Sequence, residues 1–219
     1  MATYHSLPGP RYSALLQPPV LLGQTVVVLD AASGIGLATT RRAKVQGARL
    51  IITGRDAGRL EDVADEIGVD ATAAFDPRDV TLLEAFLVGI PTPVDHVVLC
   101  MPALQPVRLA VDDFIQVREP FDRLLLPLCV AWFAVREMTQ GGSLLFIAGT
   151  NIQLPRGDVV SAVATDALSA LVARLAPEIT SVRVNLITPA ALDQPESVAA
   201  VAIRLMSDDA VTGATCKVS

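Results

Sequence analysis

The feature that most constrains the fold is a regular alternation of short apolar runs and helix-like segments, beginning at Gln24. The first run, Thr25–Asp30, reads TVVVLD. Its apolar residues are consecutive rather than alternating, as in a strand buried on both faces of a sheet. Seven runs are predicted strands: Thr25–Asp30, Ala48–Thr53, Asp70–Phe75, Val94–Cys100, Ser143–Ala148, Val182–Ile187 and Ala214–Val218. Six predicted helices lie between them: one from the loop Ala31–Gly36 to Gln46, then Asp56–Ile67, Asp79–Val88, one within Asp112–Thr139, Asp158–Ala176 (stopped by Pro177) and Pro195–Met206. This order predicts an α/β fold, doubly wound, with a mostly parallel seven-stranded sheet and helices on both faces.

Composition limits the domain organisation and the partners. The 219 residues suit a single domain over 23–219, preceded by an irregular, proline-rich leader over 1–22. Hydrophobic residues at 52% and charged residues at 18% exclude a disordered chain, and the net charge of −6 argues against nucleic acid or an anionic membrane as partner. Three cysteines without CxxC spacing favour free thiols and a cytoplasmic protein, and no metal-ligand cluster is visible.

Three residue types common in catalytic sites are rare. The chain has two tyrosines (Tyr4 and Tyr12), two lysines and two histidines. Both tyrosines precede the first predicted strand, so chemistry that needs a tyrosine in the sheet domain is nearly excluded.

The turn after the first predicted strand has a pattern typical of phosphate binding. It reads Asp30-Ala31-Ala32-Ser33-Gly34-Ile35-Gly36 and opens the first helix. Glycines let the backbone approach a phosphate, and a helix N-terminus offers unpaired N–H groups and a partial positive charge. The position between strand and helix makes an otherwise weak GxG motif informative.

With this loop in place, the sequence resembles the short-chain dehydrogenase/reductase family, whose loop reads TGxxxGIG. The resemblance extends from Leu22 to Val218, and its further matches are Gly54-Arg55, Asp76, Arg183-Val184-Asn185 with Pro189, and Thr212-Gly213. It implies a Rossmann fold and carbonyl reduction with a nicotinamide dinucleotide. The cofactor-binding residues that it implies are Ser33, Gly34, Ile35, Gly36, Arg55, Asp76 and Met101.

The residues after the second strand bear on cofactor choice. An acidic residue there would bind the ribose 2′-hydroxyl of NAD, whereas Arg55 suits the 2′-phosphate of NADP, so NADP is the expected cofactor. Alternatively, Arg55 is a solvated surface residue beside Asp56. By resemblance Asp76 would meet the adenine amino group; alternatively it is a helix N-cap.

Asp30 departs from the family pattern, which has glycine at this position. A carboxylate here would repel a pyrophosphate. Alternatively, Asp30 points away and accepts backbone N–H bonds within the turn.

The resemblance also implies a catalytic Ser, Tyr and Lys, and none of them is present. The serine position falls on Gly149, or on Ala148 with a one-residue shift, and the tyrosine and lysine positions fall on Ser161 and Thr165, at i and i+4 of one predicted helix. An aliphatic hydroxyl is a poor general acid at neutral pH. Ser161 and Thr165 are alternatively small residues that only fill space.

Two further expectations concern the pocket and assembly. The family's lid after Pro189 is nearly deleted, and the expected pocket walls are apolar (Leu99, Met101, Pro102, Leu104, Ile152 and Leu154), which favours a bulky apolar ligand. Apolar helices over Phe121–Val135 and Ser161–Ala176 favour a homodimer or homotetramer, unless they are simply core helices.

Three functions therefore stay open. The first is an NADP(H)-binding oxidoreductase with a degenerate catalytic site. The second is a non-redox cyclase, isomerase or lyase of secondary metabolism on the same scaffold. The third is a catalytically silent cofactor-binding protein.

Overall fold

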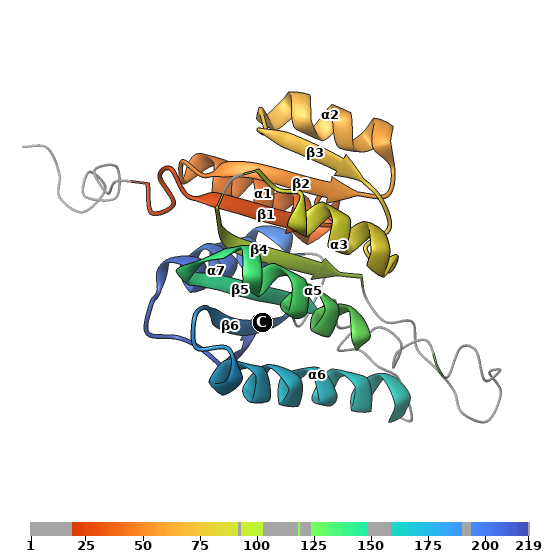
Figure 1. The fold of residues 1–219 in the computed structure, drawn as a ribbon, viewed down its shortest axis with the longest axis vertical. Coiled ribbons are helices and arrows are strands. Elements are labelled where there is room, and N and C mark those ends of the chain that lie inside the picture. Colours follow the sequence, from red (N-terminus) through yellow and green to blue (C-terminus); the bar gives the residue numbers. More distant parts are fainter. Residues whose placement is uncertain are drawn as a thin grey trace, which may run out of the picture.

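The sheet is parallel and contains all seven predicted strands (Figure 1). The computed structural model describes residues 19–91, 93–102, 118, 124–148, 159–189 and 194–218. The strand order is β3-β2-β1-β4-β5-β6-β7. The strands are β1 (Thr25–Leu29), β2 (Arg49–Gly54), β3 (Ala71–Ala74), β4 (Val94–Met101), β5 (Met138–Ala148), β6 (Arg183–Pro189) and β7 (Thr215–Val218). The doubly wound, Rossmann-like α/β architecture predicted from the alternation is confirmed.

Helices cover both faces of the sheet and give it two separate cores (Figure 1). One face carries α1 (Gly34–Val45), α2 (Ala57–Ile67) and α7 (Pro195–Ser207), and the other carries α3 (Val80–Val88), α5 (Leu125–Glu137) and α6 (Val159–Glu178). Alternate residues of β1 face the two cores, so the whole strand is buried and its sequence is continuously apolar after Thr25. No helix in these described ranges is both long and apolar enough to cross a membrane.

Several boundaries differ from the sequence prediction, most by one or two residues, and the differences at β5 and α6 have clear local reasons. The strand β5 starts at Met138 rather than Ser143, because glycines at 141 and 142 let the chain run close along β4; a Cβ on Gly142 would lie 2.3 Å from the Asp95 carbonyl oxygen. The helix α6 continues through Pro177 to Glu178. Proline removes one N–H there, but the Ile179 N–H still bonds to the Leu175 carbonyl at 2.9 Å, so the last turn is retained.

A reversal of strand order locates the functional end of the sheet. The chain winds outward from β1 to β3 and then returns to pair β4 with the other side of β1. In doubly wound sheets, ligands bind outside the carboxyl ends of the strands at such a reversal. The carboxyl ends of β1 and β4 are therefore where a site is expected.

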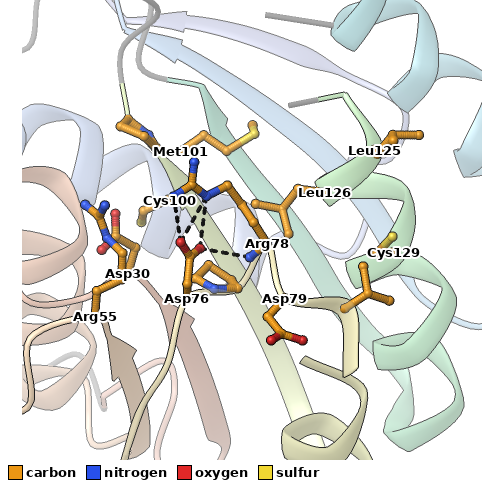
Figure 2. A pocket seen from close by; sticks show the side chains of 13 residues that line it. Asp30, Arg55, Asp76, Arg78, Asp79, Cys100, Met101, Leu125, Leu126 and Cys129 are labelled. Atoms are coloured by element: carbon orange, nitrogen blue, oxygen red, sulfur yellow. Dashed lines mark hydrogen bonds and ion pairs between the residues drawn. The ribbon is translucent and has the colours of Figure 1, made fainter. Parts of the chain in front are cut away.

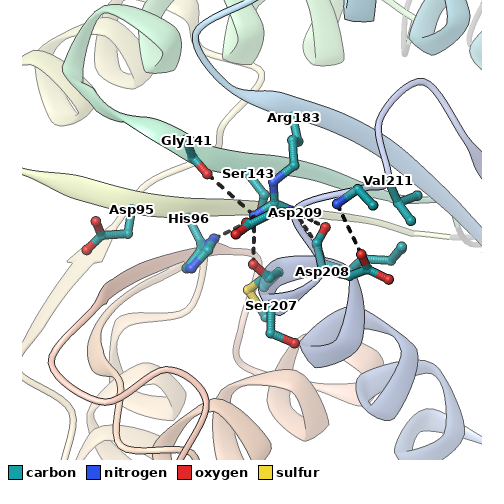
Figure 3. Close-up of polar contacts among 12 residues, drawn as sticks. Asp95, His96, Gly141, Ser143, Arg183, Ser207, Asp208, Asp209 and Val211 are labelled. Carbon is teal, nitrogen blue, oxygen red and sulfur yellow. Dashed lines mark hydrogen bonds and ion pairs between the residues drawn. The ribbon is translucent and has the colours of Figure 1, made fainter.

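The opposite, amino edge holds a buried polar network around His96 (Figure 3). The His96 ring nitrogens lie 2.8 Å from Ser143 Oγ and 2.8 Å from Gln24 Oε1, and the residue is only 2% exposed. Burial lowers the His96 pKa to about 4; Arg183 also lowers it, while Asp95 and Asp209 raise it. The ring is therefore neutral at pH 7 and joins β4 to β5 and to the residue before β1.

Arg183 closes the same edge by binding the end of α7 (Figure 3). Its guanidinium donates to the carbonyls of Leu205 at 2.6 Å, Met206 at 2.8 Å and Asp208 at 2.9 Å. These carbonyls lie at the helix C-terminus, where a cation is favoured. The Arg-Val-Asn segment at the start of β6 thus has a structural role at this edge.

The low pKa of His96 predicts acid-sensitive stability. Unfolding restores a pKa near 6.5, so the unfolded chain binds the extra proton between about pH 6.5 and pH 4, and stability falls as the pH falls through this window. We expect a loss of about 3 kcal/mol in unfolding free energy across the window from this group, at about 1.36 kcal/mol per pKa unit. Urea unfolding of the wild type and of His96→Gln at several pH values measures it. An identical pH slope in both proteins would contradict the assignment.

Candidate functional site

The loop between β1 and α1 leaves the first N–H groups of the helix open. Ser33 is the N-cap, but its side chain makes no capping bond, and the first turn carries no acidic residue. Among the described residues, nothing accepts a hydrogen bond from the N–H groups of Gly34, Ile35 and Gly36. The helices α2 and α3 instead have aspartate caps, Asp56 and Asp79. An anion is the natural partner for the uncapped helix.

The glycines of this loop have separate structural reasons. Gly34 has φ +51, a conformation that side-chain-bearing residues rarely adopt, and open space lies beside its Cα. A Cβ on Gly36 would lie 2.3 Å from the Asp30 carbonyl oxygen, so only glycine lets α1 pack this closely on the end of β1. Gly34 lies at the surface and Gly36 is buried where α1 meets the end of β1, so the N-terminus of the helix lies close to the sheet.

A pocket of about 590 Å³ lies next to the loop, at the carboxyl ends of the strands (Figure 2). It is formed by the ends of β1, β2 and β4, the turn between β3 and α3, and the start of α5. Of the predicted cofactor-binding residues, Arg55, Asp76 and Met101 line it. The other four, Ser33, Gly34, Ile35 and Gly36, form the adjacent loop and are not among its lining residues.

Arg55 lines the pocket and forms no ion pair within the described residues. It is exposed. Asp56 forms no ion pair with it and instead accepts the Arg59 N–H at 3.0 Å as the cap of α2. The structure therefore favours a pocket residue over a surface arginine paired with its neighbour.

Asp76 is not the N-cap of α3. That role belongs to Asp79, which accepts the N–H groups of Thr81 and Leu82 at 3.1 and 3.2 Å. Asp76 accepts the Arg78 N–H at 3.0 Å and forms an ion pair with its guanidinium at 2.6 Å (Figure 2). The Arg78 side chain thereby lowers the pKa of Asp76, so the carboxylate stays ionised.

Asp30 lines the pocket (Figure 2), which corrects the alternative that it points away. Among the described residues, no backbone N–H donates to its carboxylate. Burial raises its pKa, Arg55 opposes this, and the negative charge of Asp76 adds to it. The carboxylate therefore belongs to the charged wall of the site.

Several contributing residues were missed by sequence reasoning. Arg59 on α2 donates from Nε to the Ala32 carbonyl at 2.8 Å and thereby ties a second guanidinium to the phosphate-type loop. Arg78 holds Asp76, and Leu125, Leu126 and Cys129 on α5 form an apolar wall. The sequence held no clear signal for these residues, because the tertiary fold brings α2 to the loop and α5 to the pocket.

The strand β4 supplies the remaining wall. Cys100, Met101 and Pro102 line the pocket, whereas Leu99, expected there, is 1% exposed in the core under α5. Burial raises the pKa of the Cys100 thiol, with a further contribution from Asp30, so the thiol stays protonated and unreactive. The other expected wall residues, Leu104, Ile152 and Leu154, lie outside the described residues.

The positions of the missing relay are only partly described. Ser161 and Thr165 both lie on α6, one turn apart, and Thr165 is half-buried. The side chain of Ser161, Gly149 and the lid segment at 190–193 lie outside the described part of the chain.

Comparison with known proteins indicates the family. No protein-family model matches the sequence. The short-chain dehydrogenase/reductase ATR9 of Stachybotrys chlorohalonatus is 26% identical over 189 residues, which are 78% of this chain and 74% of that protein. Curated and structural neighbours together indicate the short-chain dehydrogenase/reductase family.

Two solved structures share the fold at lower identity. BdcA of E. coli, solved in complex with NADPH, is 21% identical with a TM-score of 0.79, and the match covers 91% of this chain and 94% of that one. The MalC reductase/Diels-Alderase of Malbranchea aurantiaca is 22% identical with a TM-score of 0.78, covering 91% and 95%. At this identity they support the fold alone.

Proposed function

We propose that the chain binds NADP(H) at the carboxyl ends of β1–β4, as an oxidoreductase of its family with a degenerate catalytic site. The observation that carries the proposal is the uncapped N-terminus of α1 beside a pocket that contains Arg55, which has no ion pair among the described residues. The N–H groups of Gly34, Ile35 and Gly36 would hold the pyrophosphate, and Arg55 with Arg59 would hold the 2′-phosphate. The NADPH complex of BdcA supports the cofactor type.

The described residues fit this group in most respects. Gly36 allows the close approach of helix and strand, and Met101 with Leu126 gives apolar surface for a base. When bound, NADPH would supply a hydride. The chain would supply anion binding, orientation and, through the apolar side of the pocket, exclusion of water.

The missing relay supports the degenerate character. The sequence of α6 contains no tyrosine and no lysine, so this helix offers no phenol and no ammonium to a bound carbonyl. The non-redox alternative gains support from MalC, whose described activities join reduction to a Diels–Alder reaction. The bulky apolar substrate and the cytoplasmic location are likewise proposals; three free cysteines support the location.

A homodimer or homotetramer is part of the same proposal. The outer face of α5 exposes Leu125, Leu128 and Trp132 at helical spacing, at 60%, 41% and 64%. On α6, Val159 and Val163 are exposed at 54% and 47%. Both helices cover the same face of the sheet (Figure 1), so a second copy would bury apolar surface that is now in water.

The first prediction concerns Arg55. We expect Arg55→Ala to weaken NADPH binding by about tenfold to a hundredfold, the range of a charge-assisted hydrogen bond, and to change NADH binding little. Fluorescence titration of both cofactors measures it, with Arg41→Ala as control, since Arg41 pairs with Glu66 away from the pocket. Equal losses for NADPH and NADH would contradict the role in 2′-phosphate binding.

The second prediction restores the relay. The combined changes Ser161→Tyr, Thr165→Lys and Gly149→Ser should create carbonyl reduction, because positions 161 and 165 face one side of α6. NADPH consumption with a bulky ketone is the measurement. The control carries Ser161→Phe with the same two other changes and lacks only the phenol hydroxyl. Wild-type turnover as fast as that of the restored variant would refute a degenerate site.

The third prediction concerns assembly. Replacing Trp132 by Glu should convert the oligomer to monomers, because the change removes the largest apolar side chain of the face and puts a hydrated carboxylate, with Arg136 one turn away, in its place. Light scattering after size-exclusion chromatography reports the mass. Val45→Glu, at a 76% exposed site on α1, is the matched control and should leave assembly intact. A monomeric wild type, or an oligomeric Trp132 variant, would overturn the proposal.

A further inference from the structure

Asp30 is held in an unusual backbone conformation. Its φ of +64 makes it the only non-glycine residue with positive φ in the described chain. Aspartate is among the few side-chain-bearing residues that tolerate this left-handed region. Its N–H donates to Thr53 Oγ1 at 3.3 Å, and its carbonyl lies against Gly36. With the backbone held at both points, the direction of the Cα–Cβ bond is set, and the side chain lines the pocket.

The carboxylate faces a pocket whose charges nearly cancel (Figure 2). Asp30, Asp76 and Asp79 carry negative charge, and Arg55 and Arg78 carry positive charge. Arg78 is committed to Asp76 by the ion pair at 2.6 Å. Arg55 is therefore the cation that acts on Asp30, with Asp76 repelling it from the turn after β3 and the neutral Cys100 thiol facing it from β4.

We propose that Asp30 is a specificity-determining residue that sets how strongly the site prefers a dinucleotide with a 2′-phosphate over one without. The proposal rests on the proposed dinucleotide site. When ionised, Asp30 repels the 2′-phosphate and competes with it for Arg55. When protonated, Asp30 does neither, and Arg55 is left to the phosphate.

The proton gives this preference a definite pH dependence. A bound 2′-phosphate disfavours the ionised carboxylate, so binding takes up a proton, and the preference for NADPH rises as the pH falls. Burial acts in the same direction, because it already raises the Asp30 pKa above its ordinary value. The 2′-phosphate takes up a proton below about pH 6, and its lower negative charge weakens NADPH binding. The pH dependence of the wild type is therefore compared with that of a variant that lacks the Asp30 carboxylate.

The test is the ratio of NADH to NADPH dissociation constants for the wild type, Asp30→Asn and Asp30→Gly, measured by fluorescence titration from pH 8.5 down to the lowest pH at which every variant stays folded. Glycine suits the left-handed backbone, so Asp30→Gly keeps the turn if asparagine disturbs it. At pH 8, both variants should raise the ratio by about tenfold, the equivalent of one pKa unit of coupling. The wild-type ratio should rise toward the variants' value as the pH falls.

Asp56→Asn is the matched control. It removes one negative charge next to Arg55, but Asp56 does not line the pocket, and asparagine also caps helices. Its ratio should stay within about twofold of the wild type, while thermal unfolding confirms that every variant is folded.

The outcomes separate this inference from the proposed function. Binding of both cofactors with the same ratio and pH slope in wild type and Asp30 variants overturns the role of Asp30 alone. Binding of neither cofactor to any variant overturns the dinucleotide site and the role of Asp30 with it. NADPH binding that appears only after Asp30 is replaced supports the role of Asp30, because the carboxylate then prevents NADPH binding altogether.

Discussion

The contact between Gly36 and the Asp30 carbonyl is the constraint on which the rest of the site depends. Because α1 has no side chain at this point, the helix approaches the end of β1 closely enough that a Cβ would lie 2.3 Å from the carbonyl oxygen. That approach places the uncapped helix N-terminus beside the carboxyl ends of β1 and β4. The residue whose carbonyl α1 meets there is Asp30, which has a left-handed backbone conformation and lines the pocket.

The fold was predictable because its central strands are buried on both faces. A strand such as β1 must be apolar at nearly every position, and this leaves a continuous run that a half-exposed strand would not show. The errors occurred where local signals compete with pairing. Pro177 signalled a helix end, yet the last turn holds through neighbouring bonds, and the start of β5 depends on the fit of Gly142 against β4.

The site was predictable only where function is local in sequence. The loop residues and Arg55 follow directly from the ends of strands, so their positions could be inferred from the strand boundaries. The apolar wall from α5 could not be inferred, because its residues reach the pocket through tertiary packing alone. The direction of Asp30 was decided by a backbone dihedral angle, and composition or spacing contains no information on that angle.

The polar groups at the two edges of the sheet differ in how fully they are hydrogen-bonded. At the amino edge, nearly all polar atoms of the His96 and Arg183 side chains are hydrogen-bonded. These bonds stabilise the packing of the strands against one another and against the end of α7. At the carboxyl edge, helix N–H groups and the Arg55 guanidinium lack partners within the described chain. Partners missing from one edge, while the other is nearly saturated, point to an external anion rather than to poor packing. The charge of Asp30 then governs which anion the site accepts, since it faces the same Arg55 that the anion must reach.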